Sequence, residues 1–134
     1  MRTNRSIPGA TVIPELPYAD VGEAARWLAE AFGFTVRLRI ANHRIQMNVG
    51  DGAVVLIEAR GSANKSSLLV RVENVEGHHD RAKRAGAHVL GAPETHAYGE
   101  RQYAAQDIAG HRWTFSESVA DVAPETWGGA SENL

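Results

Sequence analysis

One pattern occurs twice in this chain: residues 20–36 read DVGEAARWLAEAFGFTV, and residues 74–89 read NVEGHHDRAKRAGAHV. Each copy begins with Asp or Asn, which cap helix N-termini by accepting a hydrogen bond from the first turn. Apolar residues then recur at helical spacing, and Gly33 or Gly86 stands where a helix C-cap is expected. Each copy therefore predicts an amphipathic helix that is followed directly by a strand.

Extended runs surround both helices and complete the pattern. They are expected at 11–18, 34–40, 44–49 and 53–59 in the first half, and at 67–72, 87–90, 101–106 and 112–116 in the second. The order strand–helix–strand–strand–strand thus occurs in two modules, about residues 11–59 and 67–117. A small polar linker at 60–66 joins them, and a tail at 118–134 follows. One such module cannot cover its own sheet, so two must pack side by side.

The sequence therefore predicts an α+β fold in a single domain, residues 1–134. Two β-α-β-β-β modules would form a cupped mixed sheet with the helices outside. The alternative is a generic α+β domain whose two amphipathic helices are alike by chance.

Composition excludes several classes of protein. The chain has 134 residues, no cysteine and a formal net charge of −2. Without cysteine there is no disulfide scaffold, thiolate zinc site, iron–sulfur cluster or cysteine nucleophile. A slightly acidic chain with scattered Lys and Arg lacks the electrostatic footprint of a nucleic-acid-binding protein. No apolar run is long enough to span a bilayer and no signal-peptide core is present, so we expect a cytoplasmic protein without nucleic-acid or membrane partners.

Two pairs of short motifs resemble one protein family. Near the start, residues 17–21 (PYADV) are followed by residues 31–34 (AFGF). Near the end, residues 98–101 (YGER) are followed by residues 107–113 (DIAGHRW). These motifs resemble the opening and closing segments of the glyoxalase/bleomycin resistance/dioxygenase family, the vicinal oxygen chelate superfamily.

The closing segment looks like the ending "GxR…DPxGHxW" of one branch of this superfamily, with Ile108 in place of the usual proline. That branch is often labelled by similarity to a demethylubiquinone methyltransferase or to phosphonate-operon proteins. His111, within this ending, is expected to have a structural role. The resemblance implies the glyoxalase fold, a homodimer and a small organic molecule as binding partner.

The resemblance also indicates where metal ligands would stand. In metal-dependent relatives these positions carry His, Gln or Glu, whereas the matching positions here hold Ile13, Ser67 and Thr114. Isoleucine cannot bind a cation, and neutral hydroxyls are poor substitutes for imidazole or carboxylate. Glu94 and His96 could share one strand face, but two ligands alone are a weak signal. We therefore expect no metal and no cofactor; the alternative is a metal site at positions that the resemblance misplaces.

Strand alternation indicates which side chains would line the cup. If the three ligand positions point inward, their neighbours at a spacing of two share that face. The candidate ligand-binding residues are Glu15, Glu58, Ser67, Leu69, Arg71, Arg112, Thr114 and Ser116. Glu58 belongs to this set only if Leu56 points inward, and Trp113 would face the helices. Guanidinium groups suit carboxylates and other oxyanions, but Arg71 and Arg112 could instead neutralise the two glutamates.

Two main classes of function fit these observations. We favour a binding protein that holds a polar or anionic organic molecule in the cup without a metal. The other class is a metal-dependent lyase, isomerase or dioxygenase, and a dimeric interaction module with an empty cup is a weaker third. No Gly-x-Ser-x-Gly elbow, His-Glu-x-x-His motif or phosphate loop occurs in the sequence.

Overall fold

The computed structural model describes residues 3–59, 65–132 and 134. Most of the linker expected at 60–66 therefore lies outside the described residues. The first module contains β1 (Glu15–Tyr18), α1 (Val21–Phe32), β2 (Thr35–Ile40), β3 (Arg44–Val49) and β4 (Gly52–Glu58). The second contains β5 (Ser67–Arg71), α2 (Val75–Arg84), β6 (His88–Val89), β7 (Glu94–Thr95), β8 (Glu100–Gln106) and β9 (Arg112–Ser118), and a 3-10 helix, η1 (Pro124–Trp127), follows.

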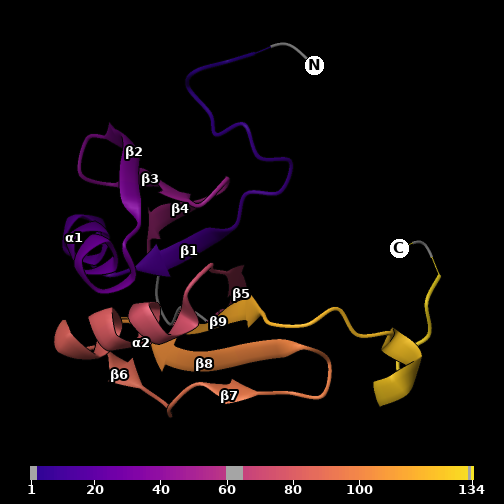
Figure 1. Ribbon diagram of the computed structural model, residues 1–134. Helices are drawn as coiled ribbons and strands as arrows, with labels where there is room; N and C mark the ends of the chain where they lie inside the picture. Colours follow the sequence, from indigo (N-terminus) through magenta and orange to yellow (C-terminus); the bar gives the residue numbers. More distant parts are fainter. Residues whose placement is uncertain (1–2, 60–64, 133) are drawn as a thin grey trace.

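The two modules form two sheets of the same design (Figure 1). The first has the order β1-β4-β3-β2, and the second has the order β5-β9-β8-β6, with β7 also paired to β8. In each sheet the strand before the helix pairs in parallel with the last strand of its module. This confirms the α+β fold of two β-α-β-β-β modules. In the described part of the chain each hydrogen-bonded ladder stays within one module, so the modules form two sheets and not one continuous sheet.

Both helices begin at the predicted caps and α1 ends at the predicted glycine, whereas α2 ends at Arg84 with Ala85 as its C-cap and Gly86 one residue beyond. The Asp20 side chain accepts a hydrogen bond from the Glu23 amide, and Asn74 accepts one from the Gly77 amide, each at 3.0 Å. Gly33 then ends α1 with φ +79°, a left-handed conformation that glycine adopts without a steric penalty.

The helices cover one face of each sheet and meet over a shared core. Trp113 of β9 is fully buried, as alternation predicts, and its ring packs edge-on against Phe32 of α1 with centroids 5.9 Å apart. The ring of Phe115 also packs against Phe32, with the two ring centroids 4.8 Å apart. Because Phe32 belongs to the first module and the other two rings to the second, these contacts join the modules.

Side chains of α2 also bind the C-terminal end of α1. Arg81 donates hydrogen bonds to the carbonyl oxygens of Ala29 and Glu30, at 3.1 and 3.2 Å. His78 contacts the carbonyl oxygen of Phe32 through Nε2 at 3.1 Å and the Tyr103 hydroxyl through Nδ1 at 2.5 Å. Burial lowers the pKa of His78 to about 4, so the ring is neutral at pH 7.

A buried carboxylate links the first strand to the turn between β8 and β9. Asp107 accepts hydrogen bonds from the Tyr18 hydroxyl at 2.6 Å and from the Trp113 indole at 3.0 Å. Its other oxygen accepts the main-chain amides of Ala109 and His111, each at 3.0 Å. Burial, followed by the Asp107 charge, raises the pKa of Tyr18 far above its ordinary value, which keeps the hydroxyl a donor. We call the buried group of Asp107, Tyr18 and Trp113, with the main-chain amides of Ala109 and His111, the Asp107 clasp.

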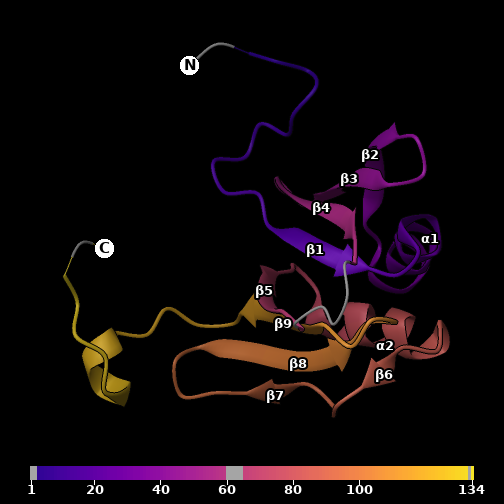
Figure 2. The same cartoon turned by 180° about the vertical axis from the view of Figure 1, so that it is seen from behind.

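The chain ends leave the modules on the side away from α1 (Figures 1 and 2). The C-terminal tail crosses the turn at Gly99, where a Cβ would lie 2.4 Å from the Ala120 carbonyl oxygen. Gly99 also has φ +84°, so both the close approach and the backbone conformation require glycine here.

Candidate functional site

The face of the second sheet that α2 leaves open carries most of the predicted site. Since Trp113 and Phe115 point into the core, the alternate residues of β9 point the other way. The parallel register sets β5 residues beside them, in the pairs Ser67–Arg112, Leu69–Thr114 and Arg71–Ser116. Six of the eight candidate residues therefore share one open face.

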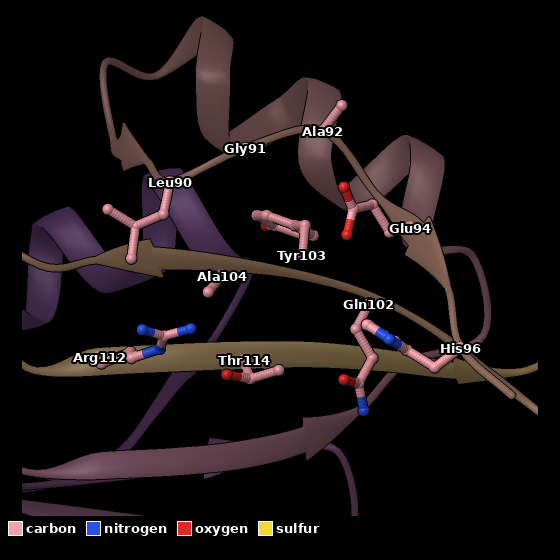
Figure 3. Close-up of a pocket in the computed structure, with 10 residues that line it drawn as sticks. All are labelled: Leu90, Gly91, Ala92, Glu94, His96, Gln102, Tyr103, Ala104, Arg112 and Thr114. Carbon is pink, nitrogen blue, oxygen red and sulfur yellow. The ribbon is translucent and has the colours of Figure 1, made fainter. Parts of the chain in front are cut away.

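A pocket of about 240 Å³ lies on this open face (Figure 3). Its floor comes from β8 and β9, and its wall comes from the segment that joins β6 to β7 and continues past it. The lining residues are Leu90, Gly91, Ala92, Glu94, His96, Gln102, Tyr103, Ala104, Arg112 and Thr114. All of them belong to the second module. Arg112 and Thr114 are the two candidate residues that the pocket contains.

The pocket carries charges of both signs. Arg112 lies on β9 at one end, and Glu94 lies on the wall toward the other end, where the His96 ring is next to Gln102 (Figure 3). Among the described residues, no carboxylate is within ion-pair distance of Arg112 and no cation is within ion-pair distance of Glu94. The pocket therefore presents two opposite charges that do not neutralise each other.

A separate polar network occupies the other end of the open face. Ser116 is 3% exposed, accepts a hydrogen bond from the Gln102 amide at 3.0 Å and donates one to Glu100 at 2.7 Å. Hydrogen bonds from Ser116 and Ser118, and then the charge of Arg71, hold the pKa of Glu100 below its ordinary value. Arg71 is thus near a carboxylate, although not the one expected from the sequence.

The two arginines do not converge on one point. Arg71 is beside Ser116 in the register, and Arg112 is four residues earlier on β9. At about 3.3 Å per residue, four residues along a strand separate their backbones by roughly 13 Å. A single small carboxylate therefore engages one of these arginines and not both.

The two glutamates of the first module lie elsewhere. Glu15 shares the open face of the first sheet and forms an ion pair with Arg44 at 2.6 Å. Glu58 is exposed and lies on the same face of β4 as Leu56, whose side chain is fully buried in the core. The condition for Glu58 to face the cup is therefore not met, because Leu56 points toward the helix.

The N-terminal segment covers part of the open face of the first sheet. Arg37 donates to the carbonyl oxygen of Arg5 at 3.0 Å, and the Gln46 amide donates to that of Ser6 at 2.9 Å. Arg37 and Gln46 also bond to each other at 2.6 Å, and Gln46 is only 4% exposed. Pro8 is buried in the same segment. The chain itself therefore occupies the face that corresponds to the pocket of the second module.

The three positions where relatives hold a metal do not form a suitable donor set. Ile13 has no donor atom, and Ser67 and Thr114 offer only neutral hydroxyls on neighbouring strands. In the described part of the chain, no group of three or more His, Asp or Glu residues is placed to hold a metal ion. His111 is bound elsewhere: its Nδ1 accepts the Ser66 amide at 2.8 Å, and its Nε2 donates to the Pro17 carbonyl at 2.9 Å.

The helices of residues 3–59 and 65–132 are too short or too polar to cross a membrane.

Two of three comparisons with known proteins agree with this architecture. Residues 11–115 match the family model described as Glyoxalase/Bleomycin resistance protein/Dioxygenase superfamily. Comparison with curated proteins gives no match. Among solved structures, TioX from Micromonospora sp. ML1 is 29% identical, with a TM-score of 0.73 over 82% of this chain and 99% of that one.

Two further structures show the same fold at lower identity. The bleomycin resistance determinant encoded on the transposon Tn5 is 21% identical, with a TM-score of 0.69 over 83% of this chain and 99% of that one. Lactoylglutathione lyase from Agrobacterium tumefaciens is 15% identical, with a TM-score of 0.68 over 92% of this chain and 100% of that one. The narrower branch suggested by the closing motif stays a prediction. The match over residues 11–115, together with the two β-α-β-β-β modules, shows that the chain belongs to the glyoxalase/bleomycin resistance protein/dioxygenase superfamily.

Proposed function

We propose that this protein binds a polar or anionic organic molecule in the pocket on the open face of its second sheet, without a divalent metal. The observation that carries the proposal is Arg112, a guanidinium in a concave site with no carboxylate of the described residues at ion-pair distance. A planar guanidinium binds a carboxylate through two parallel hydrogen bonds, which gives both affinity and orientation. Thr114, two residues further along the same strand, adds a hydroxyl beside the same position.

The remaining candidate residues would extend the site along the open face. Ser67 and Leu69 lie on β5, next to the pocket floor, and Leu69 is 68% exposed. Arg71 and Ser116 would contact only the far end of a longer ligand. There the ligand would compete with Glu100 for the charge of Arg71. Glu15 would take part only if the open face of the first sheet joins the site.

A titration with small organic acids tests the proposal. Benzoate added to isotopically labelled protein should shift the amide resonances of the pocket strands, and Arg112→Ala should weaken this binding at least about tenfold, since a charged hydrogen bond contributes about 1.5–3 kcal/mol. Arg84→Ala is the matched control, because it removes an exposed arginine of α2 on the opposite side of the sheet. Equal binding to Arg112→Ala, or no shifts at the pocket, would contradict the proposal.

We also propose that the protein forms a homodimer in the cytoplasm. The pocket has a wall from the second module alone, so its outer side is open to a second subunit. Val12 and Leu69 are 77% and 68% exposed near the junction of the modules, where a partner surface would remove them from water. Sedimentation of a monomer at micromolar concentration would contradict the dimer, and cell fractionation tests the location.

A further inference from the structure

The pocket contains two opposite charges, Arg112 and Glu94, that do not form an ion pair with each other. Arg112 carries a permanent positive charge, and Glu94 is exposed to solvent at the opposite end. A site built only for an anion would not place a carboxylate on its wall, because like charges repel. The negative end of the pocket therefore needs an explanation of its own.

The backbone register places the two charged residues far apart on the sheet. Glu94 is paired with Gln102 on β8, and Gln102 is paired with Ser116 on β9. Arg112 is four residues before Ser116, so the two backbones are separated by about 13 Å along the strands and by two strand spacings of about 4.8 Å across them. Among the described residues the two groups form no ion pair, and both of them line the same pocket.

The region between the charges is uncharged. Leu90, Ala104 and Thr114 line it, and they offer two apolar surfaces and one hydroxyl. At the Glu94 end, the ring of His96 stacks on Tyr98 with centroids 5.0 Å apart and planes 6° apart. This stack fixes the plane of the imidazole at the end of the pocket away from Arg112, and an apolar or aromatic group fits between the two charges.

From this arrangement we infer that the pocket selects a bipolar ligand: a carboxylate that binds Arg112 and an amine or other cationic group that binds Glu94, joined by a short apolar or aromatic spacer. The inference rests on the proposed function, because it assigns the acid of the ligand to Arg112. It adds a second recognition element, Glu94, and a polarity along the pocket. It also excludes dianions of the same length as preferred ligands, since their second charge would face a carboxylate.

Three matched probes test the inference on the full chain. 4-(Aminomethyl)benzoate carries both charges, 4-ethylbenzoate has the same shape without the amine, and terephthalate replaces the amine by a second carboxylate. We expect the first to bind about 1.5- to fivefold tighter than the second, the range of an exposed ion pair, and the third to bind weakest. In Glu94→Gln the first two probes should bind equally, whereas Arg112→Gln should weaken both. Glu30→Gln, on the exposed surface of α1, is the matched control and should change neither affinity.

The outcomes separate this inference from the proposed function. If 4-ethylbenzoate binds through Arg112 and 4-(aminomethyl)benzoate binds no tighter, the binding proposal stands and the bipolar ligand is refuted. If the amine preference survives in Glu94→Gln, Glu94 is not the group that recognises the cation and the inference fails. If none of the three probes binds at the pocket, both proposals fall together.

Discussion

Removal of one hydroxyl from the Asp107 clasp should destabilise the whole fold. Tyr18→Phe deletes the hydrogen bond of 2.6 Å to Asp107 and leaves the rest of the ring, which is 1% exposed, in place. A hydrogen bond to a charged group contributes about 1.5–3 kcal/mol net to stability, and its carboxylate partner stays buried. We therefore expect the free energy of unfolding to fall by about 2 kcal/mol in this variant.

Asp107→Asn should cost more than Tyr18→Phe. The new amide group would face two donors, the Tyr18 hydroxyl and the Trp113 indole, on the side where the carboxylate oxygen now accepts both. The hydroxyl can rotate and accept, but the indole can only donate, so one buried donor loses its partner. The expected loss is about 2–4 kcal/mol. Because the two variants remove the same contact, their effects should be less than additive by at least about 1 kcal/mol.

Equilibrium unfolding in urea at pH 7 measures these differences. The matched control is Tyr98→Phe, because Tyr98 is 37% exposed and its hydroxyl donates a hydrogen bond to Gln102 at 3.1 Å on the protein surface. That variant should change the free energy by less than about 0.5 kcal/mol, as exposed substitutions do. A cost of Tyr18→Phe as small as the control, or strict additivity with Asp107→Asn, would refute the view that this clasp holds the modules together.

Three other variants test separate parts of the structure. Trp113→Ala should lower the free energy of unfolding in urea by about 3–5 kcal/mol, because it leaves a large cavity in the core between the modules. A loss under about 1 kcal/mol would show that Trp113 does not face the core. His78 has a pKa of about 4 in the folded protein, lower than in the unfolded chain. Its contribution to stability should therefore be complete above pH 6.5 and be lost as the pH falls through 4, by roughly 2 kcal/mol after allowance for the partly exposed ring. The pH dependence of unfolding should be shallower by that amount in His78→Asn. Gln46→Ala should leave Arg37 and the Ser6 carbonyl with one partner fewer, cost about 1–2 kcal/mol and speed proteolysis of the N-terminal segment. An unchanged cleavage rate would show that this bond does not hold the segment.

The facing of the second module could be predicted from the sequence because alternation is a local property. On β9, large aromatic residues at 113 and 115 alternate with Arg112, Thr114 and Ser116, and burial of the aromatic set determines the direction of the polar one. Helix boundaries were equally predictable, since the capping residues form their hydrogen bonds within one turn. Each of these features depends on residues only a few positions apart.

The wall of the pocket could not be predicted in the same way. Glu94 and His96 follow a Gly-Ala-Pro sequence and a two-residue strand, where a periodic pattern has too few residues to show. Their place over β8 follows from tertiary pairing. The partner of Glu15 was missed for a related reason: Arg44 is 29 residues away, and only the packing of β1, β4 and β3 brings the two charges together.

The closing motif, which carries the strongest family signal, is used almost entirely for packing. Asp107 binds Tyr18 and Trp113, and His111 binds main-chain atoms at Pro17 and Ser66, so the conspicuous polar residues face other parts of the chain and not the pocket. Within residues 107–113 the exception is Arg112, which lies between His111 and Trp113 in sequence but points to the open face. If the proposed function is correct, a substitution at Arg112 should change ligand binding without a large effect on folding, because its side chain lies outside the core that holds its two neighbours. The closing motif of this chain is therefore a signal of its fold and says little about what the chain binds.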